Sequence, residues 1–297
     1  MTRKRFSVGK ALAWLFVAVM VFVSVFPVLW MIRTALTYND ELFQFMGMNP
    51  PLLPSQWTLD NFRRVMGFMT MEQNQALGGS GAEMHFWTYL VNSLKYTTVI
   101  VIMQVGVSVG AGYALARLQW RGRQAVFLLL MTGLLVPSMF ATIPNYATMV
   151  KLHLVSTFIG VVAPYIFGTP FAIFYMRQFF LSFPHEIEEA AELDGLGPFA
   201  RLRKIVIPMS APPILTLAMI VGVESWNNYL WPFLMAREPA IRPLTAAIGV
   251  FKAQNPSTMP DYAGLMTVST LTVIPVVILL LFLGKRMVGS LQMGGMK

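Results

Sequence analysis

The sequence predicts an all-α membrane protein with six transmembrane helices. Of its 297 residues, 56% are hydrophobic and only 12% are charged, about half the ~25% typical of soluble domains. Six apolar stretches have roughly the ~20 residues that a helix needs to cross a bilayer core, and no long stretch alternates at period two as barrel strands do. This composition excludes a soluble enzyme, a disordered chain and a free nucleic-acid-binding domain.

The six spans are expected, in order, at residues 11–33, 89–115, 125–150, 156–180, 208–232 and 263–284. The first is interpreted as an uncleaved anchor. Its apolar run, 11–32, is longer than the hydrophobic region of a signal peptide, and no small-residue cleavage site follows it. Three parts are expected: the anchor with a large outer loop in 1–87, a core with the other spans in 88–287, and a tail in 288–297.

The positive charge is distributed unevenly between the predicted loops. With the N-terminus inside, roughly twice as many Lys and Arg residues fall on the cytoplasmic side as outside. The net charge of +9 therefore indicates orientation in a membrane rather than binding to nucleic acid. We expect a multi-pass protein of the plasma (inner) membrane with both termini cytoplasmic. The absence of Cys excludes a disulfide framework and any Cys-based metal site.

The most informative loop lies between the fourth and fifth predicted spans. Pro184 can open a helix and Gly195 can close it, so 184–194 is expected to be a short surface helix. A second helix begins at Pro198, and Pro208 is expected to open the fifth span. The first of these helices holds all five acidic residues assigned to the inner side: Glu186, Glu188, Glu189, Glu192 and Asp194. From composition alone, it is either a docking surface or a solvated loop helix without a role.

A motif in this loop resembles the EAA loop of ABC importer permeases. That loop has Glu-Ala-Ala, three residues, Gly, nine residues, Ile, one residue and Leu-Pro. The matching positions here are Glu189, Ala190, Ala191, Gly195, Ile205, Ile207 and Pro208, with Asp194 also fitting and Ile207 as the one departure. The motif also falls at the expected place, between the fourth and fifth of six spans. The resemblance implies a type I ABC importer permease fold.

Further segments are similar to the carbohydrate, maltose-type branch of that family. They are Asn92-Ser93, the Tyr-Ala-Leu-Ala-Arg run at 113–117, Trp226-Asn227 and the Gly-rich C-terminus at 289–297. The resemblance covers residues 88–297 well. The N-terminal third is similar only in the order of its parts, an anchor helix followed by a large outer loop. The resemblance implies a sugar importer permease, with a glycerol-3-phosphate importer of the same branch as the alternative.

The resemblance also implies the partners. A second permease subunit, most simply in a heterodimer, would complete the path, two ATPase subunits would drive it, and an outer solute-binding protein would deliver the substrate. This chain lacks the Gly-x-x-x-x-Gly-Lys-Ser/Thr phosphate loop. It is therefore expected to be no enzyme and to hold no cofactor, with ATP and Mg²⁺ bound by the ATPase partner. Glu189, Ala190, Ala191 and Gly195 would enter an ATPase groove, and Gly294 and Gly295 of the tail would contact the same subunits.

Two other segments are candidates for substrate handling. Glu224 is the only acidic residue within a predicted span, and intramembrane charges are functional by default. Trp226, Asn227, Asn228 and Tyr229 follow it and supply amide and aromatic groups suited to sugars. The alternative is that the aromatic residues form an interfacial belt. In the outer segment, Gln254, Asn255 and Pro256 stand where the family places a loop that enters the binding protein; the alternative is an ordinary loop.

Two readings from other classes compete. Gly106-Val107-Ser108-Val109-Gly110 matches Gly-x-Ser-x-Gly, as in serine hydrolases. No predicted span carries a His to activate Ser108, so an intramembrane serine protease is disfavoured, and the two glycines instead indicate a close-packing helix face. A passive channel would have no need of the 184–194 helix, so a change at Glu189 would separate it from an importer.

Overall fold

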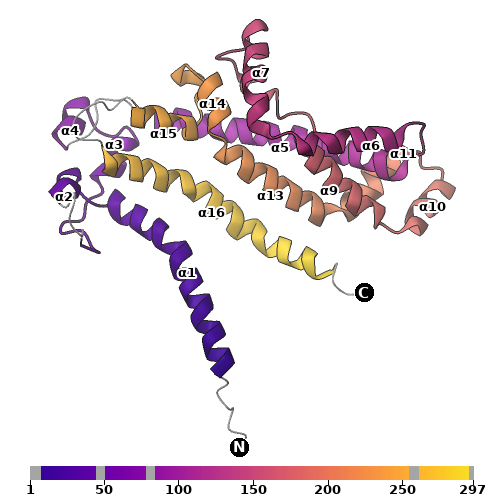
Figure 1. The fold of residues 1–297 in the computed structure, drawn as a ribbon, viewed down its shortest axis with the longest axis horizontal. Coiled ribbons are helices and arrows are strands. Elements are labelled where there is room, and N and C mark those ends of the chain that lie inside the picture. Colours follow the sequence, from indigo (N-terminus) through magenta and orange to yellow (C-terminus); the bar gives the residue numbers. More distant parts are fainter. Residues whose placement is uncertain (1–7, 45–50, 78–83, 254–260, 294–297) are drawn as a thin grey trace, which may run out of the picture. The chain divides into compact units, whose positions relative to one another are not determined.

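The computed structural model describes residues 8–44, 51–77, 84–253 and 261–293, which form helices and turns without a β-strand (Figure 1). The chain divides into two compact units. Unit 1 comprises 1–86 and 248–274, and unit 2 comprises 87–247 and 275–297. The all-α prediction is confirmed for the described residues.

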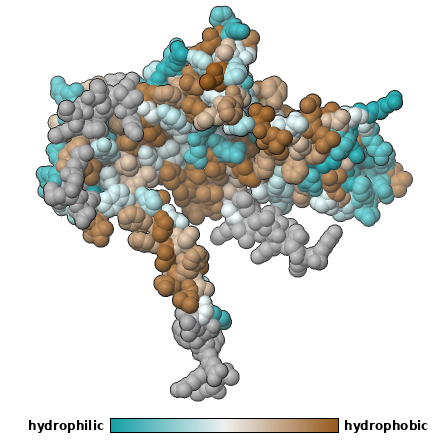
Figure 2. All heavy atoms as spheres, in the orientation of Figure 1, coloured by the Kyte–Doolittle hydropathy of each residue, from teal (hydrophilic) through white to brown (hydrophobic). Residues whose placement is uncertain are grey.

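Three of the predicted spans are single long helices. They are α1 (Val8–Ala35), α5 (Phe86–Arg117) and α16 (Tyr262–Met293). Each contains a stretch apolar and long enough to cross a membrane, at Leu12–Ala35, Phe86–Arg117 and Tyr262–Phe282. The hydrophobic side chains of α1 are exposed from Leu12 to Leu29 (Figure 2), which suits a helix surrounded by lipid, while its last residues 33–35 are buried. The first, second and sixth predicted spans are therefore confirmed as helices.

The third and fifth predicted spans are bent pairs rather than straight helices. α6 (Arg123–Thr132) and the 3₁₀ turn Gly133–Leu135 are followed at 99° by α7 (Ser138–Lys151). The break falls at Val136, whose extended backbone is the conformation favoured before Pro137. If each bent pair is one span, the described residues hold up to five spans.

The prediction that Pro208 opens the fifth span is wrong. The helical segment 198–209 contains α11 (Pro198–Arg201), a π-helical turn (Leu202–Val206) and α12 (Ile207–Met209). α13 (Ala211–Asn227) then starts anew, 81° from that direction. Pro208, Pro212 and Pro213 lack the amide N–H that a continuous helix would need through this region, so the helix breaks at Ser210 and restarts.

The fourth predicted span, 156–180, is likewise not one helix. It consists of α8 (Phe158–Val162) and α9 (Pro170–Leu181), separated by a non-helical stretch at 163–169. Thr169 caps α9 through a 3.3 Å bond from Ala172 N to its hydroxyl, and Pro170 occupies the first helical position. A helix of 12 residues spans only about 18 Å, which is shorter than a bilayer core.

The remaining helices are short. They are α2 (Asn39–Gln44), α3 (Asp60–Val65), α4 (Met71–Ala76), α10 (His185–Leu193), α14 (Leu230–Met235), the 3₁₀ turn Pro239–Ile241 and α15 (Leu244–Ala253). Unit 2 has a continuous hydrophobic core built from α5, α8, α9, α13 and α14, in which Met176, Phe180, Leu217 and Met235 are fully buried. This core fixes the positions of the loops around α10.

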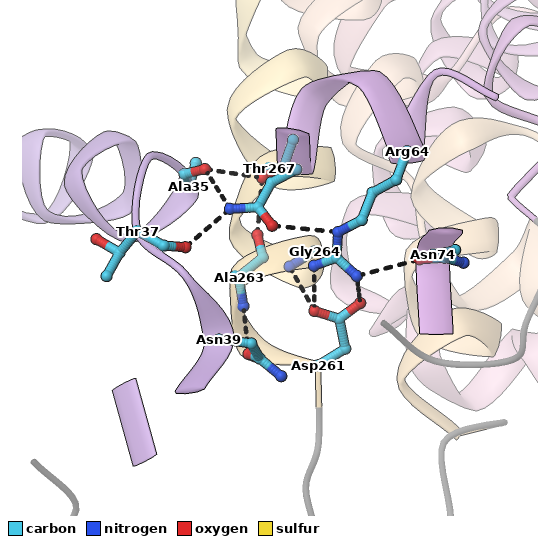
Figure 3. Close-up of polar contacts among 10 residues, drawn as sticks. Ala35, Thr37, Asn39, Arg64, Asn74, Asp261, Ala263, Gly264 and Thr267 are labelled. Carbon is cyan, nitrogen blue, oxygen red and sulfur yellow. Dashed lines mark hydrogen bonds and ion pairs between the residues drawn. The ribbon is translucent and has the colours of Figure 1, made fainter. Parts of the chain in front are cut away.

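Unit 1 is organised by a polar network instead (Figure 3). The Arg64 guanidinium donates two 2.6 Å hydrogen bonds to the Asp261 carboxylate, and both side chains are almost completely buried. Asp261 Oδ1 also accepts a 2.7 Å bond from Gly264 N, so it caps the start of α16. A Cβ atom on Gly264 would lie 2.4 Å from Asp261 Oδ2, which explains the glycine at this position.

Candidate functional site

The predicted surface helix at 184–194 is present as α10, and its ends have the expected caps. Pro184 precedes the first helical residue, and Gly195 adopts a left-handed backbone with φ +79°. The Leu196 amide donates a 3.0 Å hydrogen bond to Ala191 O, and the Gly195 amide donates a 2.9 Å hydrogen bond to Glu192 O. These are the two hydrogen bonds of a Schellman cap. The chain therefore leaves α10 in a direction fixed by one glycine.

α10 has two distinct faces. Glu188 and Ala191, one turn apart, are buried, and Ile187 packs against the core of unit 2. Glu189 and Ala190 are exposed, and Leu193 is 90% exposed. Ala191 thus packs α10 onto its own chain, whereas the Glu and the first Ala of the motif face outward. Figure 2 shows hydrophilic side chains gathered at this end of unit 2.

The inward face of α10 meets the last residue of α5. Arg117 Nη1 lies 2.9 and 2.8 Å from the two ring nitrogens of His185, and Arg117 Nη2 donates to Phe183 O. Arg117 Nε is 3.8 Å from Glu188 Oε2, and the two side chains are 3% and 10% exposed. Neither Arg117 Nε nor Glu188 Oε1 has a hydrogen-bond partner among the described residues.

The other predicted loop positions lie on the segment after α10. Arg201 Nη1 forms a 2.7 Å ion pair with Glu192 and ties α11 to α10. Phe199 is 76% exposed, so it does not share a buried face with Leu202 and Ile205, which are half-buried. The π-helical turn at 202–206 changes the side-chain register there. Asp194 and Pro208 are exposed.

The candidate path residues fall at the end of α13. Glu224 and Asn227, one turn apart, are exposed, while Trp226 between them is buried. Asn228 is half-buried, shares a side-chain hydrogen bond with Tyr165, and its carbonyl accepts a 2.9 Å bond from Thr245. Tyr229 is exposed and stacks on Phe233 with ring centroids 5.2 Å apart.

The alternative interpretation, an interfacial aromatic belt, does not fit Trp226 or the neighbouring Trp231, because both are buried. Trp231 is buried and its indole N–H lies 3.2 and 3.1 Å from the carbonyls of Gly160 and Val161. A cavity of about 10 Å³ lies beside Ser225, Trp226 and Asn228, far below the ~300 Å³ of typical ligand pockets. This chain therefore encloses no sugar-sized pocket at these described residues.

The Gly-x-Ser-x-Gly segment does not form a catalytic site. Ser108 is fully buried and its hydroxyl has no hydrogen-bond partner among the described residues. A Cβ on Gly106 or Gly110 would meet nothing within 4 Å in the described part of the chain, so the predicted close-packing face makes no close approach inside this chain. The close approach on α5 is made by Gly112, where a Cβ would lie 2.8 Å from Met176 Cβ.

The Arg64–Asp261 pair was missed by sequence reasoning. The two residues are 197 positions apart, and no local motif links them. Asp-Tyr at the start of an apolar run is the one available signal, since Asp is a favoured N-cap. The predicted binding-protein residues Gln254, Asn255 and Pro256, and the tail residues Gly294 and Gly295, lie outside the described residues.

The chain is similar to known proteins along most of its length. The family model for the binding-protein-dependent transport system inner membrane component matches residues 106–291. An arabinooligosaccharides transport system permease protein, AraQ, from Halalkalibacterium halodurans is 32% identical, with 96% of this chain and 97% of that protein covered. The trehalose/maltose transport system permease protein MalG of Thermococcus litoralis is 26% identical over 94% of this chain and 93% of its own.

The fold is shared with a solved transporter as well. The crystal structure of a bacterial ABC transporter involved in the import of the acidic polysaccharide alginate matches with a TM-score of 0.77 and 19% identity, over 96% of this chain and 98% of that one. The protein is thus a multi-pass membrane permease subunit with helical spans broken at prolines. It belongs to the family of binding-protein-dependent transport system inner membrane components, and the resemblance to permeases of carbohydrate ABC importers is confirmed.

Proposed function

We propose that this chain is one half of the membrane channel of a sugar importer and that α10 is its docking element for the ATPase. The observation that carries the proposal is the two-faced α10, which turns Glu189, Ala190 and Leu193 outward and keeps Glu188 and Ala191 inside. Small and acidic side chains on an exposed helix allow close approach and charge pairing with a partner. Ala191 acts indirectly, by packing α10 in place.

The proposed topology puts α10 and both termini in the cytoplasm. The positive-inside rule supports it, because most Lys and Arg residues flank the loops on that side. Gln254, Asn255 and Pro256 then lie outside, where we propose contact with the solute-binding protein. The C-terminal glycines, Gly294 and Gly295, are proposed to contact the ATPase pair. ATP and Mg²⁺ are bound by that pair and not by this chain.

The proposed path runs past the exposed end of α13. A carboxylate in a membrane is costly unless it faces protein, water or a polar cavity. Glu224 and Asn227 are both exposed on the described part of this chain, so its own residues do not bury them. A second permease subunit, most simply a different chain, would cover them and enclose the path, which also accounts for the lack of a sugar-sized cavity beside Trp226, Asn228 and Tyr229.

The proposed cargo is an oligosaccharide or a related polyol. The relatives carry names of arabinooligosaccharide and trehalose/maltose transport systems. The amides and aromatic rings at 226–229 suit neutral hydroxyl-rich substrates. A glycerol-3-phosphate importer is the second candidate, and a panel of loaded binding proteins would distinguish the two.

The test uses the chain co-expressed with its neighbouring permease and ATPase subunits in nanodiscs. Glu189→Lys and Gly195→Trp should abolish hydrolysis stimulated by the binding protein and reduce co-purification of the ATPase. Gly197→Trp is the matched control for the glycine, because Gly197 is also exposed but has an ordinary backbone, with φ −65°. Glu72→Lys makes the same charge change in unit 1.

Two outcomes would overturn the proposal. Normal stimulated hydrolysis in both α10 variants would remove the docking role from this helix. Sugar flux that persists in Glu189→Lys vesicles without ATP would support a passive channel instead.

A further inference from the structure

α5 is held at both of its ends by side chains that no docking or path role explains. We propose that α5 is a mechanical link between the α10 loop and the segment 240–244. Arg117 and Asn92 are the positioning residues at its two ends. The inference rests on the proposed function, because it assigns the route by which movement of α10 reaches the opposite end of unit 2.

The first attachment is at Arg117, the last residue of α5. Its guanidinium contacts three groups at the entrance to α10: Phe183 O, the ring of His185 and the carboxylate of Glu188. The Arg117 and Glu188 side chains are only 3% and 10% exposed, so their ion pair is shielded from water, whereas the contact with His185 is exposed. A displacement of α10 therefore pulls on the end of α5 through a charged and buried group.

The turns of α5 before Arg117 are joined to α9, which leads into α10. Gly112 allows the α9 backbone at Met176 to approach closely, and Tyr113 packs edge-on against Phe180 at 5.9 Å. Arg177 Nε donates a 3.3 Å bond to Leu115 O. These successive contacts make the end of α5 and the α9–α10 region move as one body.

The second attachment is at the other end of α5. Asn92 Nδ2 donates to Ala240 O at 2.8 Å and to Arg242 O at 3.1 Å. Tyr96 OH donates a 2.5 Å bond to Ile241 O, and Ser93 Oγ accepts a 2.8 Å bond from Leu244 N. Three side chains within two turns of α5 thus hold an extended and 3₁₀ segment that leads into α15.

The helix between these attachments is continuous. α5 has 32 residues and contains no proline, whereas α1, α7 and α16 each contain one. From Asn92 to Arg117 the rise is about 37 Å at 1.5 Å per residue, which exceeds the ~30 Å bilayer core. Sharp kinks arise mostly at Pro, at Gly/Ser pairs or at π-bulges; α5 has no proline and remains one uninterrupted α-helix through its glycines at 106, 110 and 112. α5 can therefore transmit a displacement with little bending.

The test compares variants at the two ends in the assembled transporter in nanodiscs. Arg117→Gln and Asn92→Ala should each lower the stimulation of hydrolysis by the binding protein at least about fivefold, the low end of ordinary coupling between sites. Because both ends serve one link, the double variant should be no worse than the more severe single variant. Co-purification of the ATPase should stay normal, since neither residue lies on the exposed face of α10.

Matched controls stand beside each position. Arg121→Gln removes an exposed Arg four residues after Arg117, and Lys95→Gln changes an exposed residue one turn from Asn92. Both should keep wild-type stimulation. Arg117→Lys keeps the charge but not the planar fork that reaches three groups, so it should fall between wild type and Arg117→Gln.

A distance measurement separates linkage from simple loss of folding. The chain has no Cys, so spin labels can be placed at Gln119→Cys and Glu186→Cys without removing native thiols. Both positions are exposed, one directly after α5 and one in the first turn of α10. The distance between the labels should be the same in the nucleotide-free and ATP-bound transporter, and should change between those states once Arg117→Gln is added.

The results that overturn the link differ from those that overturn the docking role. Wild-type stimulation in Arg117→Gln or Asn92→Ala, or losses in the double variant that multiply, would contradict the link while leaving α10 as the docking helix. A label distance that changes with ATP in the otherwise native chain would contradict it too. Absence of stimulated hydrolysis in the native transporter would refute the proposed function itself.

Discussion

Each unit has a buried Arg–carboxylate pair at a junction between distant segments, and these two pairs differ in how completely they are satisfied; a further buried pair in unit 1, Arg33–Glu41, is 3.7 Å apart. In unit 1, Arg64 and Asp261 form two parallel 2.6 Å hydrogen bonds, with side chains 2% and 1% exposed. In unit 2, Arg117 and Glu188 approach only to 3.8 Å, and each keeps a buried polar atom without a hydrogen bond. The Arg64–Asp261 pair is therefore fully hydrogen-bonded, whereas the Arg117–Glu188 pair is only partly satisfied.

This difference indicates different tasks. A bidentate pair whose remaining groups are also bonded is rigid, because any displacement breaks several short contacts at once. Arg64 Nε bonds Asn61, which in turn bonds Ala35 O and Thr37 O, so the pair ties the end of α1 to the start of α16 (Figure 3). The Arg117–Glu188 contact is one of three that Arg117 makes at the entrance to α10, so the attachment of α10 to α5 does not depend on this ion pair alone.

The largest expected effect is at Asp261. Asp261→Asn removes the charge that the buried Arg64 guanidinium requires, and breaking a buried pair costs about 3–5 kcal/mol. The variant should show a clearly lowered unfolding midpoint in mixed detergent micelles. Arg63→Met is the control, because Arg63 is 64% exposed and contacts Asp60 only at 3.4 Å. Equal shifts for the two variants would show that the buried pair has no special role in unit 1.

A smaller effect is expected where α10 ends. Gly195→Ala places a Cβ on a backbone with φ +79°, which costs about 1–2 kcal/mol. No described atom lies within 4 Å of that Cβ, so the cost comes from the backbone alone. The same change at Gly197 should be almost neutral. The comparison requires unfolding midpoints and stimulated hydrolysis for both variants, and an equal loss at Gly197 would contradict the role of the cap.

The α10 region illustrates what sequence can predict. Pro184, Gly195 and the acidic first turns act within a few residues of one another, so local rules gave the helix and its cap correctly. Pro137 was equally visible, but a run of hydrophobic residues continues across it. Span lengths judged from hydrophobicity therefore concealed the break there and the non-helical stretch at 163–169, whereas the boundary predicted at Pro208 falls at Ser210.

The contacts that organise the two units could not be predicted in this way. Arg64 meets Asp261 across 197 positions, and Asn92 meets Ala240 across 148. Such pairings depend on how whole helices pack, and neither residue type carries a signal for its partner. Which residues of α10 face outward was also undetermined, because the Glu-Ala-Ala motif alone does not say which alanine is buried.

The same carboxylate-to-amide change at Glu188 should have little effect on stability. Glu188→Gln weakens a 3.8 Å contact, but it also neutralises a buried oxygen that has no hydrogen bond. The two contributions oppose each other, so the net change should be about 1 kcal/mol or less. Unfolding midpoints of Glu188→Gln and Asp261→Asn, measured under identical conditions, test the contrast between the two buried pairs directly. A loss as large as that at Asp261 would show that the Arg117–Glu188 pair is a rigid anchor too.

The smallest effect is expected at the pair between α10 and α11. Glu192 and Arg201 lie 2.7 Å apart, but the Glu192 side chain is 69% exposed. Exposed pairs contribute roughly 0.2–1 kcal/mol, and Glu192→Ala should fall at the low end of that range. The deficit should disappear in about 1 M salt, where charges are screened within about 3 Å. The unfolding midpoints of the native chain and of Glu192→Ala, each measured at low and at high salt, provide the check. A deficit that persists at high salt would mean that Glu192 stabilises α10 through packing rather than through its charge.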